Sequence, residues 1–153
     1  MQTLELKVPP PLVAALIGAS MWVIARLPPA IALPEFIRTV TALPVALAGA
    51  ALTITGVLSF RLARTTVNPM KPEAAALLVR SGVYRLSRNP MYLGLLVVLV
   101  AWAAFLSTVW AMLGPLAYVL YINRFQIAPE ERILSAKFGA SYAEYKAQVR
   151  QWL

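Results

Sequence analysis

Four long apolar stretches, separated by polar and mostly basic segments, give this chain its hydrophobic pattern. They run over Leu12 to Leu27, Phe36 to Leu62, Met91 to Ser107 and Val109 to Phe125. A membrane-spanning helix needs about 20 mainly apolar residues, so the second stretch is long enough to tilt and the first is short for a full crossing. Because almost nothing separates the last two stretches, we predict a helical hairpin there. The pattern therefore predicts an all-α integral membrane protein: one membrane domain over residues 1–153 with four transmembrane helices.

The tail, residues 126–153, also has helical signals. Pro129 suits a first helical turn, and the helix dipole favours the glutamates that follow it. Gly139 is a typical helix end, and Ser141 and Glu144 have the spacing of a capping box that starts a second helix. Apolar and aromatic residues recur at three- and four-residue spacing across both helices, so we expect the tail to fold back against the membrane surface or the central loop. The members of this stripe are Leu134, Phe138, Tyr142, Tyr145, Val149 and Trp152.

Composition and charge support a membrane location. The chain is 60% hydrophobic and 13% charged, against about half and about a quarter in soluble domains. The net charge is +8, but the basic residues flank apolar stretches, so we interpret them as signals for topology and anionic lipid and expect no nucleic acid partner. The loop over residues 63–90 is polar, with a short interfacial helix expected over Glu73 to Val79.

Loop charges also predict the orientation in the membrane. With four spans, only Arg26 and Arg38 lie on one side, and 12 of the 14 Lys and Arg residues lie on the other. The positive-inside rule then places both termini and the loop in the cytoplasm, for a protein of the cell inner membrane. The twelve are Lys7, Arg61, Arg64, Lys71, Arg80, Arg85, Arg88, Arg124, Arg132, Lys137, Lys146 and Arg150.

The chain contains neither cysteine nor histidine. This excludes disulfides, zinc fingers, thiolate nucleophiles and acid–base catalysis by imidazole, and we expect no metal site. If the protein is an enzyme, its chemistry needs no such group, or a cofactor supplies the reactive one.

The most informative stretch is the turn from Gly82 to Gly94, which runs without a spacer into the third apolar stretch. It places two arginines, an amide and two phenols at the mouth of a predicted membrane helix. A polar cofactor could meet a lipid-soluble substrate at such a place.

This turn and the tail together resemble the isoprenylcysteine carboxyl methyltransferase and phospholipid methyltransferase superfamily. The resemblance covers roughly Leu77 to Trp152. It is carried by Gly82-Val83-Tyr84, by Arg88-Asn89-Pro90-Met91-Tyr92-Leu93-Gly94, and by the tail from Glu130-Glu131 through Phe138-Gly139 to Tyr142 and Tyr145. The family carries histidine at the position of Asn89. An amide can still form hydrogen bonds, but it cannot take a proton as imidazole does.

The resemblance implies S-adenosylmethionine-dependent methyl transfer to a lipid-like or amphiphilic acceptor at the cytoplasmic membrane face, with S-adenosylhomocysteine as product. It also implies that the two-helix tail closes the cofactor pocket, with the active site in the cytoplasm. It makes Arg124 and Glu131 the expected catalytic residues, with Arg124 beside the acceptor. The expected cofactor-binding residues are Leu78, Val79, Gly82, Tyr84, Arg88, Asn89, Pro90, Tyr92, Leu93, Gly94, Glu130, Glu131 and Tyr142.

Several of these residues also have an ordinary structural interpretation. Tyr84 and Tyr92 could belong to the aromatic belt at the membrane interface. Gly94 could serve close helix packing. Glu130 could simply complement a helix N-terminus, and Arg124 could be a surface anchor that extends to the interface.

Other functions compete with methyl transfer. A small four-helix transporter would normally carry an ionisable residue inside the membrane, and no apolar stretch here has one well inside it. A nonenzymatic protein that binds anionic lipid explains the charge but not the ordered tail. A membrane reductase with a nicotinamide cofactor is a further alternative. The acceptor's identity stays open between prenylated cysteine, phospholipid amine, isoprenoid acid and small hydrophobic thiol or amine.

Overall fold

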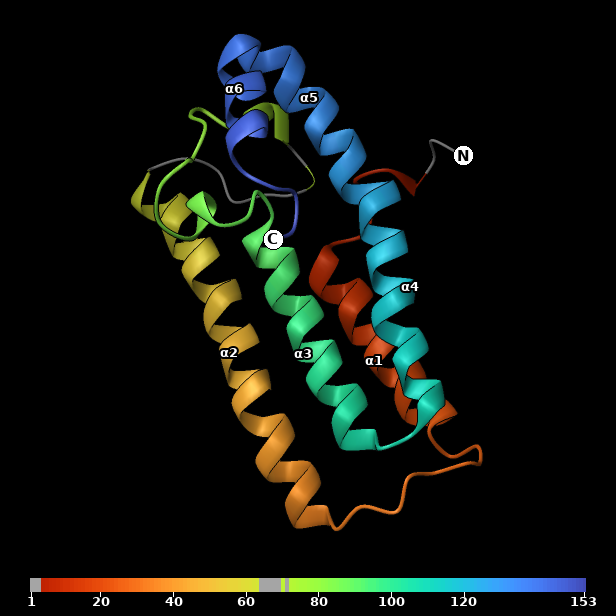
Figure 1. Cartoon of the computed structure of the whole chain (residues 1–153). Coiled ribbons are helices and arrows are strands. Elements are labelled where there is room, and N and C mark those ends of the chain that lie inside the picture. Colours follow the sequence, from red (N-terminus) through yellow and green to blue (C-terminus); the bar gives the residue numbers. More distant parts are fainter. Residues whose placement is uncertain (1–3, 64–69, 71) are drawn as a thin grey trace.

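The computed structural model describes residues 4–63, 70 and 72–153 (Figure 1). Four helices lie side by side as a bundle: α1 (Pro10–Ile24), α2 (Glu35–Leu62), α3 (Pro90–Leu106) and α4 (Leu113–Ile122). Two further helices, α5 (Ala128–Phe138) and α6 (Ala140–Gln148), lie over one end of the bundle. Within the described residues, β structure is limited to an isolated bridge between Ala30 and Thr108. The predicted all-α fold class is confirmed.

The closest helix packing joins α2 to α3, and small residues make it possible. A Cβ atom added to Gly94 would lie 2.2 Å from Thr53 Oγ1 and 2.5 Å from Gly49 O. A Cβ atom added to Gly56 would lie 2.6 Å from the side chain of Met91. Glycine at these positions lets the two backbones approach, as small residues do between membrane helices. This close packing therefore fixes the position of the start of α3 relative to α2.

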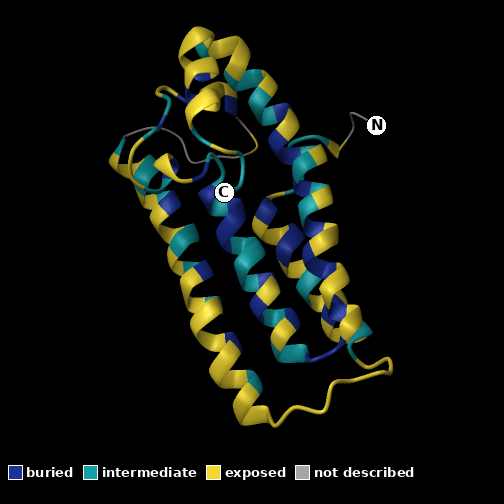
Figure 2. Cartoon of the chain, in the orientation of Figure 1, coloured by how far each residue is buried: buried dark blue, intermediate teal, exposed yellow. Residues whose placement is uncertain are grey.

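The outside of the bundle is strongly apolar. By length and composition, α2 is the one helix among the described residues that could cross a membrane, while α1 and α3 are apolar but shorter. Only 11% of the most apolar window of α2 is buried, so packing in a core does not account for its apolarity. Figure 2 shows most of α2 as exposed. These lengths support one full-length span where the sequence predicted four, so they do not establish the four-span topology.

The predicted hairpin between the last two apolar stretches is present. Ser107 ends α3 in the left-handed conformation, with φ of 51°, and its N–H donates to the carbonyls of Ala103 and Ala104. The chain then passes through a short 3-10 helix, η4 (Val109–Met112), into α4.

No break separates α4 from α5, because a π-helical turn, η5 (Asn123–Ile127), connects them (Figure 1). As predicted, Pro129 and the glutamates after it lie in the first turn of α5. Proline has no N–H to donate, and its ring crowds the carbonyl four residues earlier. That carbonyl, Phe125 O, accepts the N–H of Leu6 instead, at 3.0 Å. The proline therefore accounts for the widened turn in a helix that otherwise continues from the bundle into the tail.

Two local predictions differ from the structure. Gly139 ends α5 with φ of 50°, as expected, but α6 begins directly after it without a side-chain cap. Ser141 and Glu144 therefore form no capping box; Glu144 instead pairs with Arg80 at 3.5 Å. The helix expected over Glu73 to Val79 is also wrong, because only Pro72–Ala74 is helical, as the 3-10 turn η2. The segment beyond it, Ala75 to Arg80, is irregular, with a bend at Leu77.

Candidate functional site

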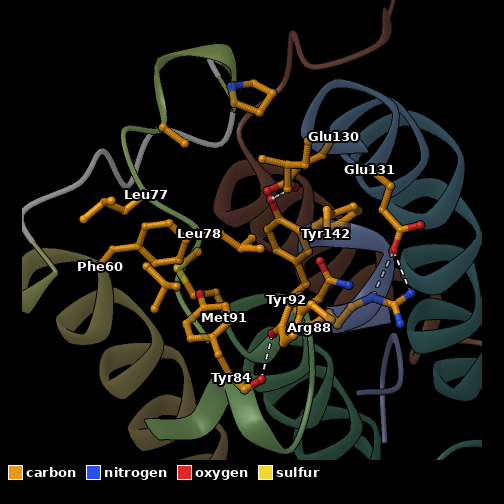
Figure 3. Close-up of a pocket in the computed structure, with 16 residues that line it drawn as sticks. Phe60, Leu77, Leu78, Tyr84, Arg88, Met91, Tyr92, Glu130, Glu131 and Tyr142 are labelled. Atoms are coloured by element: carbon orange, nitrogen blue, oxygen red, sulfur yellow. Dashed lines mark hydrogen bonds and ion pairs between the residues drawn. The ribbon is translucent and has the colours of Figure 1, made fainter. Parts of the chain in front are cut away.

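A pocket lies between the start of α3, the irregular segment Ala75 to Arg80 after η2, and the inner faces of α5 and α6 (Figure 3). Its enclosed free space is about 60 Å³, within an envelope of about 750 Å³ that includes the opening to solvent. Polar groups gather at one wall and apolar side chains at the other. The lining residues are Phe60, Pro72, Ala75, Leu77, Leu78, Val79, Tyr84, Arg88, Asn89, Met91, Tyr92, Glu130, Glu131, Leu134, Tyr142 and Tyr145.

The turn that enters α3 positions the polar wall. Gly82, with φ of 60°, opens a 3-10 helix, η3 (Gly82–Arg85), that contains Tyr84. Pro90 occupies the first turn of α3, where a missing N–H costs nothing. Ser87 Oγ accepts the N–H of Asn89 at 3.1 Å and fixes the residue just before the helix. Arg88 and Asn89 are therefore held at the pocket mouth by local hydrogen bonds.

A charged cluster joins this turn to the tail. Arg88 Nη2 and Nε donate to Glu131 Oε1 at 2.7 and 3.2 Å, and Lys146 Nζ donates to Glu131 Oε2 at 2.9 Å. Burial alone would raise the pKa of the Glu131 carboxyl, but the hydrogen bonds and charges of Lys146 and Arg88 outweigh it and hold the pKa below its ordinary value. The Glu131 side chain is 17% exposed and that of Arg88 is 10% exposed. Glu131 is thus ionised and fully occupied by cations of the chain itself.

The neighbouring carboxylate, Glu130, has a different environment. Tyr92 Oη donates to Glu130 Oε2 at 2.9 Å, and Gln126 Nε2 donates to Tyr92 Oη at 3.3 Å. Desolvation by burial raises the pKa of Glu130 to about 7; the Tyr92 hydrogen bond opposes this rise and the charge of Glu131 adds to it. None of the ion pairs in the described part of the chain includes Glu130. Near neutral pH, this pocket carboxyl can therefore be protonated or ionised.

Tyr84 contributes an unused hydroxyl to the same pocket. Its Oη is buried and has no hydrogen-bond partner among the described residues, although its backbone carbonyl accepts Tyr145 Oη at 2.7 Å. Burial, and secondarily the charge of Glu130, raise the pKa of the Tyr84 phenol, so it stays protonated. A buried hydroxyl without a partner loses its hydrogen bonds to water and gains none in return. Such a group indicates where a ligand could be bound.

The last residues of the chain close the polar wall from outside. Asn89 Nδ2 donates to Gln151 O at 3.1 Å, Ser87 Oγ donates to the same carbonyl at 3.2 Å, and Arg88 N donates to Arg150 O at 3.0 Å. Trp152 Nε1 donates to Asn123 Oδ1 in the π turn at 3.1 Å. Asn89 therefore uses its amide to hold the C-terminal segment.

The structure brings together most of the residues expected from the sequence. Nine of them line the pocket: Leu78, Val79, Tyr84, Arg88, Asn89, Tyr92, Glu130, Glu131 and Tyr142. Gly82, Pro90, Leu93 and Gly94 lie outside the lining and serve the turn and the helix packing around it. Arg124 also lies outside it, 51% exposed and 3.2 Å from Glu5. The arrangement therefore places one of the two expected catalytic residues, Glu131, at the pocket.

Of the apolar wall, the sequence predicted only Leu78 and Val79. The other apolar residues come from three places: Phe60 from the end of α2, Ala75 and Leu77 from the irregular segment, and Met91 from the start of α3. Two sequence features could have identified more of the lining. The motif from Arg88 to Gly94 contains Met91, and the tail stripe contains Leu134 and Tyr145. Nothing in the local sequence marks Phe60, which reaches the pocket only because α2 packs on α3.

A family model and two relatives are similar to this chain. The family model described as phospholipid methyltransferase matches residues 37–141. An uncharacterized protein of Haemophilus influenzae is 51% identical over 63 residues, which are 41% of this chain and all of that protein. The protein-S-isoprenylcysteine O-methyltransferase of Saccharomyces cerevisiae is 39% identical over 85 residues, 52% of this chain and 33% of that enzyme. No solved structure is significantly similar.

The bundle, the folded-over tail and the pocket between them define a helical protein with a polar site at one end. The family match spans the whole of α3 to α5, most of α2 and every pocket residue up to Leu134. The chain belongs to the phospholipid methyltransferase family. It spans about a third of the length of the yeast enzyme.

Proposed function

We propose that this protein is an integral membrane methyltransferase that uses S-adenosylmethionine and acts on a lipid-like or amphiphilic acceptor at the cytoplasmic membrane face. One observation carries the proposal. Glu130, a carboxyl group with no cationic partner among the described residues, shares a pocket with the Tyr84 hydroxyl, which has no hydrogen-bond partner among them. S-adenosylmethionine carries a sulfonium and an ammonium group, together with ribose hydroxyls, and such a ligand complements both side chains.

The other pocket residues fit the same cofactor. Apolar side chains of Leu77, Leu78 and Val79 form a wall suited to an adenine ring. Tyr142 lies on the facing wall, from α6 (Figure 3). The enclosed space of about 60 Å³ is smaller than a nucleoside, so binding would need the irregular segment Ala75 to Arg80 and the tail to separate.

When bound, S-adenosylmethionine supplies an already activated methyl group, so the protein mainly aligns donor and acceptor and excludes water. Ionised Glu130 would balance the positive charge, and Tyr84 Oη would donate a hydrogen bond. We propose that Glu131 acts by fixing Arg88 at the pocket mouth through the 2.7 Å pair. Neither a metal nor a histidine base is needed for a carboxylate, thiolate or neutral amine acceptor.

The acceptor would reach this pocket from the bilayer. The pocket adjoins the start of α3, and the surfaces of α1, α2 and α4 around the bundle expose large apolar side chains. We propose four membrane spans with the pocket, the tail and both termini in the cytoplasm, in agreement with the positive-inside distribution. Arg124 stays a proposed contact for an anionic acceptor headgroup. It lies at the same end of the bundle, although it pairs with Glu5.

Calorimetric titration tests the proposal. Purified protein in detergent or lipid should bind S-adenosylmethionine and S-adenosylhomocysteine, and Glu130→Gln should weaken binding of the charged donor by about tenfold, as expected for loss of one charge pair. Glu144→Gln on α6 is the matched control, because Glu144 is 63% exposed and outside the pocket lining. A folded protein that binds neither compound would end the proposal. Radiolabelled methyl transfer to phosphatidylethanolamine or to a farnesylated cysteine analogue would then identify the acceptor class.

A further inference from the structure

A second cavity lies away from the pocket. An apolar groove of about 910 Å³ runs between α1 and α2 on the surface of α3. It is open along its length. The lining residues are Pro11, Ala14, Ala15, Gly18, Ala19, Trp22, Thr39, Ala42, Leu43, Ala46, Leu95, Val98, Leu99, Ala101, Trp102 and Phe105.

The groove has two arginines at one end, the end of α3 that lies farthest from the pocket. Trp22, Thr39 and Phe105 line that end, since they lie near the end of α1, the start of α2 and the end of α3. The Arg26 guanidinium lies 4.1 Å from the centroid of the Trp22 ring, and the Arg38 guanidinium lies 5.5 Å from that of Phe105. Both cations therefore contact rings that form the groove wall.

Neither arginine is neutralised by the described part of the chain. Arg38 Nη1 donates to the carbonyl of Phe105 at 3.4 Å, but its buried Nε has no hydrogen-bond partner there. None of the ion pairs among the described residues includes Arg26 or Arg38. Arg26 is exposed and Arg38 is partly buried, so the unfavourable group is the buried Nε of Arg38, a charged donor without an acceptor among the described residues. An anion at this end of the groove would remove that penalty.

We propose that the groove binds one anionic membrane lipid, with an acyl chain lying along α3 and the headgroup phosphate bound by Arg38 and Arg26. The apolar lining complements the chain, and the planar guanidinium complements phosphate oxygens. This site lies at the opposite end of α3 from the polar pocket and takes no part in methyl transfer. The lipid proposal rests on the proposed placement of the bundle in a membrane, and it does not depend on the proposed enzymatic activity.

Two of the four tryptophans line the groove, which provides a direct measurement. The protein is placed in vesicles that contain dibrominated phosphatidylglycerol or dibrominated phosphatidylcholine, whose bromines quench tryptophan at short range. We expect the anionic lipid to quench with an apparent affinity at least about fivefold higher than the zwitterionic lipid, because each arginine beside an anionic headgroup contributes about fivefold. Equal quenching by the two lipids in the unmodified protein would overturn the proposal.

Variants then test the residues. Arg38→Gln should reduce the headgroup preference roughly fivefold, Arg38→Lys should retain most of it, and Arg85→Gln, an exposed arginine at the other end of the molecule, should leave it unchanged. Ala46→Phe should fill the groove and abolish the preferential quenching. The matched control Ala48→Phe, on the exposed face of the same helix, should not. A preference that survives both Arg38→Gln and Ala46→Phe would locate the lipid elsewhere.

Discussion

Arginines lie beside both ends of α3, but their surroundings differ. At its start, Arg88 is bonded to Glu131 and to backbone carbonyls of the tail, so its charge is neutralised within the chain. At its end, Arg38 meets an aromatic ring and a single carbonyl. The same contrast recurs between the adjacent glutamates, because Glu131 is paired with two cations and Glu130 with none among the described residues. Charges paired within the chain stabilise the fold, whereas unpaired charges indicate where ligands are expected.

The largest expected effect comes from breaking the paired end. Arg88→Ala leaves Glu131 without its closest partner and frees the carbonyl of Val149, so the free energy of unfolding should fall by about 3 kcal/mol. Thermal unfolding in detergent measures this. Arg85→Ala, an exposed arginine three residues earlier, should change stability by less than about 0.5 kcal/mol. Equal effects of the two substitutions would contradict the contrast between paired and unpaired charges.

The next effect concerns the unpaired carboxyl and depends on pH. The pKa of Glu130 is raised from 4.5 to about 7 in the folded protein, so between these values the folded state binds more protons than the unfolded state. The stabilisation is complete below pH 4.5 and is lost as pH rises through 7, by up to about 3 kcal/mol. Glu130→Gln should flatten this part of the stability profile. If the stability of Glu130→Gln and of the unmodified protein changed with pH in parallel, the titrating group would not be Glu130.

Cofactor affinity should show the opposite trend with pH. A cationic donor favours ionised Glu130, so binding of S-adenosylmethionine should strengthen as pH rises from 6 towards 8. The product S-adenosylhomocysteine lacks the sulfonium charge and should depend less on pH. Calorimetry at several pH values measures both affinities. If donor and product showed the same pH dependence, the sulfonium would not bind next to Glu130.

A smaller effect is expected at Asn89. Asn89→Ala removes the hydrogen bond to Gln151 O and should lower the free energy of unfolding by about 1 kcal/mol. Asn89→Asp should cost more, because it places a carboxylate against a carbonyl oxygen. Denaturant titration in mild detergent gives the values. An aspartate variant as stable as the unmodified protein would show that this amide does not hold the C-terminal segment.

The smallest effect on stability is expected at Tyr84. Because its hydroxyl has no partner among the described residues, Tyr84→Phe should change the free energy of unfolding by less than about 0.5 kcal/mol while weakening cofactor binding severalfold. Tyr145→Phe is the matched comparison, since it removes the 2.7 Å bond to Tyr84 O and should cost about 1 kcal/mol. The reverse order of stability would show that the Tyr84 hydroxyl is bonded in solution.

Local sequence features were enough to predict the helices and much of the polar wall. The apolar runs predicted α1 to α3 to within two or three residues at each end, and Gly139 marked the end of α5 correctly. The capping-box spacing of Ser141 and Glu144 failed because α6 already begins at Ala140, directly after Gly139, so Ser141 lies inside the helix and not at its N-cap. The contribution of Phe60 could not be predicted, because it depends on the close approach of α2 to α3.

By itself, the sequence determined the all-helical class and the hairpin at Ser107, because these depend on composition, periodicity and local spacing. The family came from the resemblance of the motifs that run through Arg88, Asn89 and Glu130. The tertiary structure alone decided which charges are paired. Glu130 and Glu131 are adjacent in sequence, yet successive helical positions point about 100° apart, so one side chain meets Arg88 and Lys146 and the other meets Tyr92 inside the pocket. The groove beside Arg38 likewise exists only because three helices pack with their small residues together.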